Sequence, residues 1–235
     1  MLPGARAAIG STSAKGAGVR AVIFANGTFE EPQQAQAFLR TGDLIVAVDG
    51  GTRHVWAAGV DPHVVVGDLD SLSDEAKQRL RAADVEVMPF APRKDQTDLE
   101  LALYHVLSEG ADEIVILAAL GGRLDQTIAN LLLLTIPQLA ACDARVVQGE
   151  EEAFVIRGAA RIEGRSGDTV SLIPVGGDAS GVTTVGLEYA LDDEALDFGP
   201  ARGVSNVLKE GTAHVRVRQG LLLCVVTHQT GTHER

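Results

Sequence analysis

The chain has 235 residues, of which 46% are hydrophobic and 22% are charged, which suits one large or two modest packed domains and excludes disorder over most of the length. Its formal net charge of −12 argues against nucleic acid as a partner, because that binding depends on a basic face. Any phosphate ligand must therefore be received locally, by a metal ion, by Arg or Lys, or by backbone N–H groups.

Residues 1–19 are expected to form a flexible extension, since they are rich in Gly, Ala and Ser and lack the apolar core of a signal peptide. The longest aliphatic run, Leu131 to Leu134, is too short to span a bilayer. The two cysteines, Cys142 and Cys224, fit neither a disulfide framework nor a metal-ligand spacing. A cytoplasmic protein without a membrane partner is expected.

From residue 20 to 149, short aliphatic runs alternate with amphipathic stretches. The predicted strands cover residues 21–25, 44–48, 64–66, 85–88 and 114–118, with a weaker candidate at 145–147. Helices are predicted after residue 30, over 52–58, after residue 73, over 97–107 and over about 124–139, where Pro137 ends or kinks the last one. Strands that alternate with helices predict a Rossmann-like, mostly parallel α/β sandwich.

The pattern changes in residues 150–235, where short strands are separated by turns rich in Gly, Asp and Ser. The predicted strands are 153–156, 170–173, 182–185, 213–217 and 221–226, with no convincing long helix. We expect a small second domain here, an antiparallel β-sandwich or barrel, with the boundary near residue 150.

Residues suited to chemistry follow five consecutive strands of the first domain. These segments are Asn26-Gly27, Asp49-Gly50-Gly51, Gly67-Asp68-Leu69-Asp70-Ser71, Arg93-Lys94-Asp95-Gln96-Thr97-Asp98 and Gly121-Gly122-Arg123-Leu124-Asp125. Ligands of open parallel sheets bind beyond the carboxyl ends of the strands. The five segments are therefore expected to meet at one site.

Asp68 and Asp70 share a face if their segment is extended. Two carboxylates about 5 Å apart repel by roughly 3 kcal/mol at an effective dielectric constant of 20, a cost that a divalent cation removes. Mg²⁺ prefers carboxylate oxygens together with substrate phosphates. A solvated turn explains the pair equally well, because Asp, Gly and Ser all favour turns.

Helix capping offers an alternative account of two further segments. Thr97 and Glu100 form a Thr-x-x-Glu capping box, but capping does not explain why Arg93 and Lys94 precede further acids. Arg123 follows two glycines at a helix start and suits phosphate, although a glycine turn with Asp125 as the cap would look the same. A combined metal and phosphate site accounts for both signs of charge.

Several common sites are missing from the sequence. It contains neither Gly-x-Gly-x-x-Gly nor a P-loop, and no Ser/His/Asp constellation, so no nucleophile is assigned. Trp56 is expected in the core rather than at a stacking site.

Taken in order and spacing, the five strand-end segments resemble those of the thiamine pyrophosphokinase (thiamine diphosphokinase) family. The resemblance continues through Thr127 and Asn130, and in the second domain through residues 170–174, 182–187 and 203–206. It implies a nucleotide-binding catalytic domain over 20–149 and a thiamine-binding and dimerisation domain over 150–235. It also implies a homodimer with active sites between the subunits, and transfer of the pyrophosphoryl group of ATP to the hydroxyl of thiamine, which yields AMP.

The resemblance also implies roles for individual residues. The catalytic set is Asp68, Asp70, Asp95, Asp98 and Arg123, in which Asp68, Asp70 and Asp98 hold Mg²⁺. The ATP and substrate contacts are Asn26, Asp49, Gly50, Gly51, Lys94, Gln96, Thr97, Gly122 and Asp125. Ser205 and Asn206, supplied by the other subunit, would contact thiamine. Apart from the resemblance, the sequence requires no general base, and Asp98 or Asp125 as the acceptor of the alcohol proton is a hypothesis.

Two positions depart from the family pattern: Gln126 stands where His is frequent, and Val207 where Glu is frequent. They put a His–phosphate contact and details of thiamine binding in doubt. A different Asp-x-Asp metal transferase, with Asp68 as nucleophile or metal ligand, is the competing enzyme hypothesis. A sensor of thiamine or nucleotide that kept the fold is the non-catalytic one.

Overall fold

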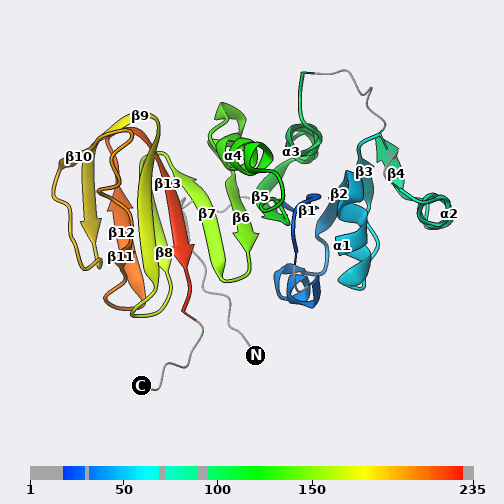
Figure 1. The fold of residues 1–235 in the computed structure, drawn as a ribbon, viewed down its shortest axis with the longest axis horizontal. Coiled ribbons are helices and arrows are strands. Elements are labelled where there is room, and N and C mark those ends of the chain that lie inside the picture. The colour runs from blue at the N-terminus through cyan, green and yellow to red at the C-terminus, as the bar shows by residue number, and fades with distance from the viewer. Residues whose placement is uncertain (1–17, 30–31, 69–71, 89–94, 230–235) are drawn as a thin grey trace. The chain divides into compact units, whose positions relative to one another are not determined.

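The computed structural model describes residues 18–29, 32–68, 72–88 and 95–229. The chain divides between Gly149 and Glu150 into two compact units, which are described separately (Figure 1).

The N-terminal unit is built on a parallel sheet. Its strands are β1 (Val19–Phe24), β2 (Leu44–Val48), β3 (Val64–Val66), β4 (Glu86–Met88), β5 (Ala111–Leu117) and β6 (Asp143–Gln148). They lie in the order β4-β3-β2-β1-β5-β6, and the pairs found among the described residues are parallel, which confirms the predicted α/β class. The strand order reverses between β1 and β5, which makes this junction the topological switch point.

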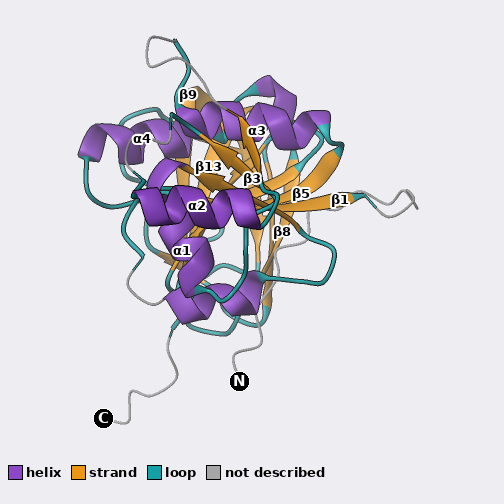
Figure 2. Ribbon diagram, turned by 90° about the vertical axis from the view of Figure 1, so that its right-hand side faces the viewer, coloured by secondary structure: helices purple, strands orange, loops and turns teal. Residues whose placement is uncertain are grey.

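Helices connect these strands (Figure 2). They are α1 (Thr52–Ala57), α2 (Asp74–Ala82), α3 (Asp98–Ser108) and α4 (Leu124–Leu133), with the 3-10 helices η1 (Pro32–Phe38), η2 (Asp49–Gly51) and η3 (Pro137–Leu139). The helix predicted after residue 30 is a 3-10 helix, and the one predicted to reach about residue 139 ends at Leu133. Pro137 starts η3 instead of kinking α4, because proline suits a first helical position better than an interior one.

The apolar face predicted for residues 97–107 is buried as expected. In α3 the buried residues are Leu99, Ala102, Leu103 and Val106, and the helix packs against β2, β3 and β5. Thr97 is the N-cap, since its Oγ1 accepts from the N–H of Glu100 at 3.2 Å. In a capping box the Glu100 side chain would accept from the backbone N–H of Thr97. Here Glu100 Oε1 accepts from the hydroxyl of Tyr104 at 3.0 Å instead.

Trp56 lies on α1 and packs against the core but is only half-buried, so its predicted core position is confirmed in part. The guanidinium of Arg79, from α2, lies 4.6 Å from the centre of its ring, a cation–π distance. The same guanidinium pairs with Asp61 at 2.7 Å. These contacts hold α2 against α1 and against the segment that follows α1.

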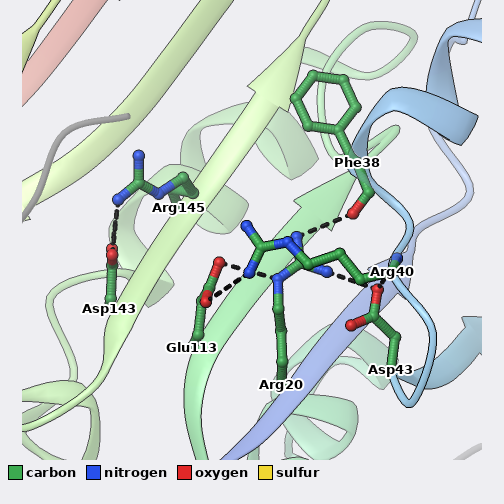
Figure 3. A network of polar contacts seen from close by, with 7 residues as sticks. All are labelled: Arg20, Phe38, Arg40, Asp43, Glu113, Asp143 and Arg145. Carbon is green, nitrogen blue, oxygen red and sulfur yellow. Dashed lines mark hydrogen bonds and ion pairs between the residues drawn. The ribbon is translucent and has the colours of Figure 1, made fainter. Parts of the chain in front are cut away.

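A network of charges lies at the amino-terminal ends of β1, β2 and β5 (Figure 3). Arg20 donates to the carboxylates of Asp43 and Glu113 and to the carbonyl of Phe38. Arg40 adds a second contact to Glu113 at 3.0 Å. The Asp43 side chain is only 3% exposed, so its charge depends on Arg20 for compensation.

The C-terminal unit is antiparallel. Its strands are β7 (Glu151–Ile156), β8 (Ala159–Glu163), β9 (Thr169–Val185), β10 (Glu194–Leu196), β11 (Asn206–Val207), β12 (Thr212–Arg216) and β13 (Gln219–Thr227). β13 pairs with β7 and β9, and β12 pairs with β8 and β9. Its core is aliphatic around Phe154, which is fully buried.

One long strand joins the two layers of this unit. The strands predicted at 170–173 and 182–185 are both parts of β9, so the turn expected between them is wrong. Gly176 and Gly177, with φ of 77° and 147°, let β9 bend without ending. Residues 169–175 of β9 pair with β13, which pairs once more at Ser180 beyond the bend, and residues 183–185 pair with β12, so the strand passes from one sheet to the other. β8, β10 and β11 were not predicted, because each is short and partly exposed.

A histidine anchors the chain just after β13. His228 Nδ1 lies 2.8 Å from the buried carboxylate of Asp168, which also accepts from the backbone N–H of Gln229 and Arg165. The carboxylates of Glu152 and Asp168 raise the pKa of His228 to about 9 against the opposing effect of burial.

Within the described residues, no helix has the length and apolar character that crossing a membrane requires.

Candidate active site

Two loops are joined at the switch point, where β1 and β5 end side by side. The N–H of Gly27 donates to the carbonyl of Ala118 at 2.7 Å, and the N–H of Thr28 donates to the carbonyl of Leu120 at 2.9 Å. The loop after β1 and the loop after β5 therefore form one continuous rim. Ligands of open α/β sheets bind at such a place.

Glycines allow the loop after β2 to approach this rim. A Cβ on Gly50 would lie 2.4 Å from Asn26 Oδ1, and a Cβ on Gly51 would lie 2.1 Å from the carbonyl oxygen of Phe24. Side chains at these positions would push the backbones apart. The structure thus brings together Asn26, Gly50 and Gly51, three of the residues expected to contact ATP.

Asp49 and Asp68 belong to the same edge of the sheet. Asp49 has a left-handed backbone, with φ of 47°, and a Cβ on Gly67 would lie 1.8 Å from its Oδ1. The Asp49 carboxylate therefore lies against the backbone of Gly67, directly before Asp68. Asp68 is exposed at the carboxyl end of β3.

The carboxylates fit a magnesium site in their chemistry, because Mg²⁺ prefers carboxylate oxygens. Asp70, between Leu69 and Ser71, lies outside the described residues. In the described part of the chain, no group of three or more His, Cys, Asp and Glu is gathered closely enough to hold a metal ion. The set of Asp68, Asp70 and Asp98 stays a prediction.

The start of α3 carries the next predicted residues. Asp98 is the first residue of α3 and is half-buried, whereas Asp95 and Gln96 are exposed before it. A helix that packs against parallel strands as a crossover connection starts at their carboxyl edge, which puts Asp98 on the same side as Asp68. Lys94, with Arg93, lies outside the described residues.

The loop after β5 leads into α4 through two left-handed glycines, Gly121 and Gly122, with φ of 83° and 71°. Arg123 is the N-cap residue of α4, so the alternative with Asp125 as the cap is wrong. Arg123 Nε donates to Asp125 Oδ1 at 3.1 Å, and both side chains are exposed. This contact with Arg123 lowers the pKa of Asp125, which makes its carboxylate a weaker proton acceptor.

Ser205 and Asn206 lie in the C-terminal unit and differ in environment. Ser205 is exposed, with a left-handed φ of 61°, and its N–H donates to Ser171 Oγ at 3.1 Å. Asn206 is buried in β11. Its Oδ1 accepts from the N–H of Tyr189 at 3.0 Å and its Nδ2 donates to the carbonyl of Tyr189 at 2.7 Å. The amide of Asn206 therefore holds the backbone of Tyr189, whose side chain is 70% exposed.

Both units of the chain match profiles of known protein families. The family profile "Thiamin pyrophosphokinase, catalytic domain" matches residues 35–146, and "Thiamin pyrophosphokinase, vitamin B1 binding domain" matches residues 159–222. The chain belongs to the thiamine pyrophosphokinase family.

Individual members of the thiamine pyrophosphokinase family agree in sequence and fold. The thiamine pyrophosphokinase of Bacillus subtilis (strain 168) is 28% identical over 184 residues, which cover 77% of this chain and 86% of that protein. Thiamine pyrophosphokinase 1 of Oryza sativa subsp. japonica is 28% identical over 166 residues, or 66% of this chain and 62% of that protein. A crystal structure of the Bacillus subtilis protein superposes with a TM-score of 0.80 at 26% identity, covering 90% of this chain and all (100%) of that one.

The positions that depart from the usual thiamine pyrophosphokinase pattern are both at the surface or near it. Gln126 is exposed in the first turn of α4, and its N–H donates to Asp125 Oδ1 at 2.9 Å. Val207 is half-buried in β11, and its N–H donates to Asn206 Oδ1 at 2.9 Å. Neither substitution interrupts the local backbone.

Sequence reasoning missed His54 and Arg53, which support the rim, and gave no role to Asn130, which it had named only as part of the family resemblance. His54 Nε2 lies 3.1 Å from the carbonyl of Gly27, and Asn130 Nδ2 donates to the carbonyl of Ala119 at 2.7 Å. A guanidinium nitrogen of Arg53 lies 3.4 Å from each of the carbonyls of Asn26 and Gly27. His54 and Arg53 are in the first turn of α1, a position that could have flagged them, because the first turn of such a helix faces the strand ends.

Proposed function

We propose that this chain is a thiamine diphosphokinase, which transfers the pyrophosphoryl group of ATP to the hydroxyl of thiamine and releases AMP. The observation that carries the proposal is the carboxyl edge of the parallel sheet, in a chain whose two units match the catalytic and vitamin B1 binding profiles. The rim at this edge carries Asn26 and Arg123, and the loops after β2 and β3 carry Asp49 and Asp68. Transfer of this kind depends mainly on positioning and on charge stabilisation.

The acidic residues would serve the metal end of the site. Asp68, Asp70 and Asp98 would hold Mg²⁺, with Asp95 close to them in sequence. When bound, Mg²⁺ neutralises negative charge that develops on the phosphates. Asp49 lies beside Gly67, where its carboxylate extends this acidic edge toward Gly50 and Gly51.

The basic and glycine residues would serve the phosphate end. Gly122 leaves space at the start of α4, where a helix N-terminus favours anions. Arg123 suits a bidentate contact with phosphate, and to make it the side chain exchanges Asp125 for the ligand. Lys94, Gln96 and Thr97 would complete the contacts to ATP, although the Thr97 hydroxyl already caps α3.

The C-terminal unit would supply the thiamine end. Ser205 is exposed and can contact the substrate, whereas Asn206 acts through the backbone of Tyr189. A flat cationic ring is well received by an exposed aromatic side chain such as Tyr189.

A homodimer with active sites at its interface is supported by two exposed apolar surfaces. On α4, Leu124 is 74% exposed, and Ile128 and Leu132 follow it at intervals of four residues on the same helical face. In the C-terminal unit, Tyr189, Phe198 and Val204 are exposed. Exposed apolar side chains of this kind mark interaction sites, and a second copy of the chain would be the partner that covers them.

The test of the reaction is a mixture of the protein with ATP, Mg²⁺ and thiamine. AMP and thiamine diphosphate are expected in equal amounts, with no product when Mg²⁺ is removed by a chelator. ADP as the nucleotide product would contradict pyrophosphoryl transfer, and a phosphorylated Asp68 would favour a phospho-aspartate enzyme instead. We also propose a cytoplasmic location, because Cys142 and Cys224 fit no disulfide framework.

Asp98 has a separate test. Asp98→Asn keeps the shape of the side chain but removes the charge, so turnover is expected to fall by about a hundredfold or more. Full turnover with normal dependence on Mg²⁺ would rule out the role of Asp98 in metal binding and in proton transfer.

A further inference from the structure

Two buried polar side chains support the rim from opposite sides. His54, on α1, is 6% exposed, and its Nε2 lies 3.1 Å from the carbonyl oxygen of Gly27 in the loop after β1. Asn130, on α4, is 8% exposed, and its Nδ2 donates to the carbonyl oxygen of Ala119 in the loop after β5 at 2.7 Å. Each loop thus has one backbone carbonyl turned toward the protein and held there.

The burial of Asn130 is not explained by packing. α4 has the sequence LDQTIANLLL, yet Asn130 is its buried residue while Leu124, Ile128 and Leu132 are exposed. An amphipathic helix normally buries its leucines, because burying an amide costs free energy unless the amide is hydrogen-bonded. The helix is therefore oriented so that the amide reaches Ala119.

His54 is equally committed to its loop. Burial lowers the pKa of the imidazole below its ordinary value, so the ring is neutral near pH 7 and carries one N–H, which Nε2 directs to Gly27. The ring also meets Phe29 edge-on, with the two centres 5.6 Å apart. These contacts leave the ring one orientation.

The two loops are themselves coupled. The N–H of Gly27 donates to Ala118 and the N–H of Thr28 donates to Leu120, so a shift in one loop is passed to the other. The loop after β5 contains three left-handed residues, Ala118, Gly121 and Gly122. Glycine adopts this backbone freely, but a non-glycine residue such as Ala118 keeps it only where its surroundings hold it. The N–H of Gly27 contacts the carbonyl of Ala118, and the amide of Asn130 holds the next carbonyl, that of Ala119.

We propose that His54 and Asn130 are positioning residues that together fix the shape of the rim and thereby set the affinity for ATP, without touching either substrate. The inference rests on the proposed function, because it assumes that ATP binds at this rim. Ser205 and the rest of the predicted thiamine contacts are on the other unit, so affinity for thiamine should be far less sensitive.

The kinetic test uses His54→Leu and Asn130→Leu, which remove the donors and keep apolar bulk. Each is expected to raise the KM for ATP about fivefold to tenfold, the effect of one lost hydrogen bond, and to change the KM for thiamine by less than about twofold. His54→Gln, which retains an N–H donor, should lie closer to the wild type. Thr135→Val is the matched control, because Thr135 Oγ1 donates to a carbonyl of α4, that of Leu132 at 2.7 Å, away from the rim.

The double variant tests whether the two residues act on one structure. If they act through the coupled loops, the combined rise in the KM for ATP falls well short of the product of the single effects. Any of three results would overturn the inference. The single-variant effects on the KM for ATP could multiply in the double variant, the KM values for ATP and thiamine could rise equally, or the KM for ATP could stay unchanged.

Amide hydrogen exchange without substrates separates this inference from the proposed function. Exchange in residues 24–29 and 117–122 is expected to be at least about threefold faster in both single variants, each also loosening the loop that it does not touch. Thr135→Val should leave both segments unchanged. If the wild type forms no AMP the proposed function fails, and the exchange data still decide whether His54 and Asn130 hold the rim; unchanged exchange would show that they do not.

Discussion

At the residue scale, His228 links the stability of the fold to pH. Its imidazole lies between Asp168 and Glu152, and folding raises its pKa from 6.5 to about 9. A group whose pKa is raised by folding stabilises the native state in its protonated form. The contribution is therefore complete below pH 6.5, declines above it, and is lost as the pH rises through about 9.

The rise in pKa from 6.5 to about 9 converts to a fall of about 3 kcal/mol in the free energy of unfolding as the pH rises across this window. Urea unfolding followed by circular dichroism measures it. His228→Gln should remove most of the dependence, and His214→Gln, at an exposed position on β12, should keep it. An unchanged pH dependence in His228→Gln would show that another group is responsible.

Arg123 is the second residue whose chemistry can be isolated. Lysine keeps the charge but cannot make the bidentate contact of a guanidinium, so Arg123→Lys should raise the KM for ATP about tenfold. The free energy of unfolding should change by less than about 0.5 kcal/mol, since Arg123 and Asp125 are both exposed. Arg161→Lys, at an exposed pair with Glu163 on β8, is the control for steady-state kinetics. A normal KM for ATP in Arg123→Lys would contradict a bidentate contact between Arg123 and the phosphates.

At the scale of whole elements, Arg20 joins the starts of three strands. Arg20→Met leaves the carboxylate of Asp43 buried without its cation, and a loss of about 3–5 kcal/mol in the free energy of unfolding is expected. Arg161→Met, from an exposed pair, should cost less than about 1 kcal/mol. Equal losses in thermal or urea unfolding would mean that burial does not decide the strength of these pairs.

A helix or strand could be predicted from the sequence where its own residues determine it, and not where contacts with distant parts of the chain determine it. β2 and β3 match their predicted ranges, because a buried parallel strand is a continuous aliphatic run. β9 could not be predicted as one strand, since its bend at Gly176 looks the same in sequence as a turn. Pairing with β12 and β13, which comes from distant sequence, decides that the strand continues.

The candidate site also contains residues that could be predicted from the sequence and residues that could not. The strand-end rule predicted that the loops after the strands would meet, and the structure brings Gly50 against Asn26 and Asp49 against Gly67. It could not predict His54 or Asn130, because their importance comes from one hydrogen bond each to a loop distant in sequence. Nor could it predict that the Asn206 amide binds the backbone of Tyr189.

At the scale of the whole molecule, the exposed face of α4 predicts self-association. The exposed residues of this face are Leu124, Ile128 and Leu132. A two-fold axis at Ile128 would therefore pair Leu124 of one copy with Leu132 of the other. Ile128→Asp puts a charge at the centre, and a shift from dimer to monomer is expected in sedimentation or light scattering, with lower activity per chain. Gln138→Asp, an exposed position beyond α4, is the control. A wild-type monomer with full activity would contradict the dimer.

The contact between Trp56 and Arg79 has a practical consequence. Trp56 is the only tryptophan of the chain, and α1, which carries it, starts directly after Asp49-Gly50-Gly51. Indole emission responds to the field of a nearby cation, so a small movement of α1 against α2 changes the signal. We therefore expect ATP binding to change the emission of Trp56, which a fluorescence titration of the unlabelled protein would measure.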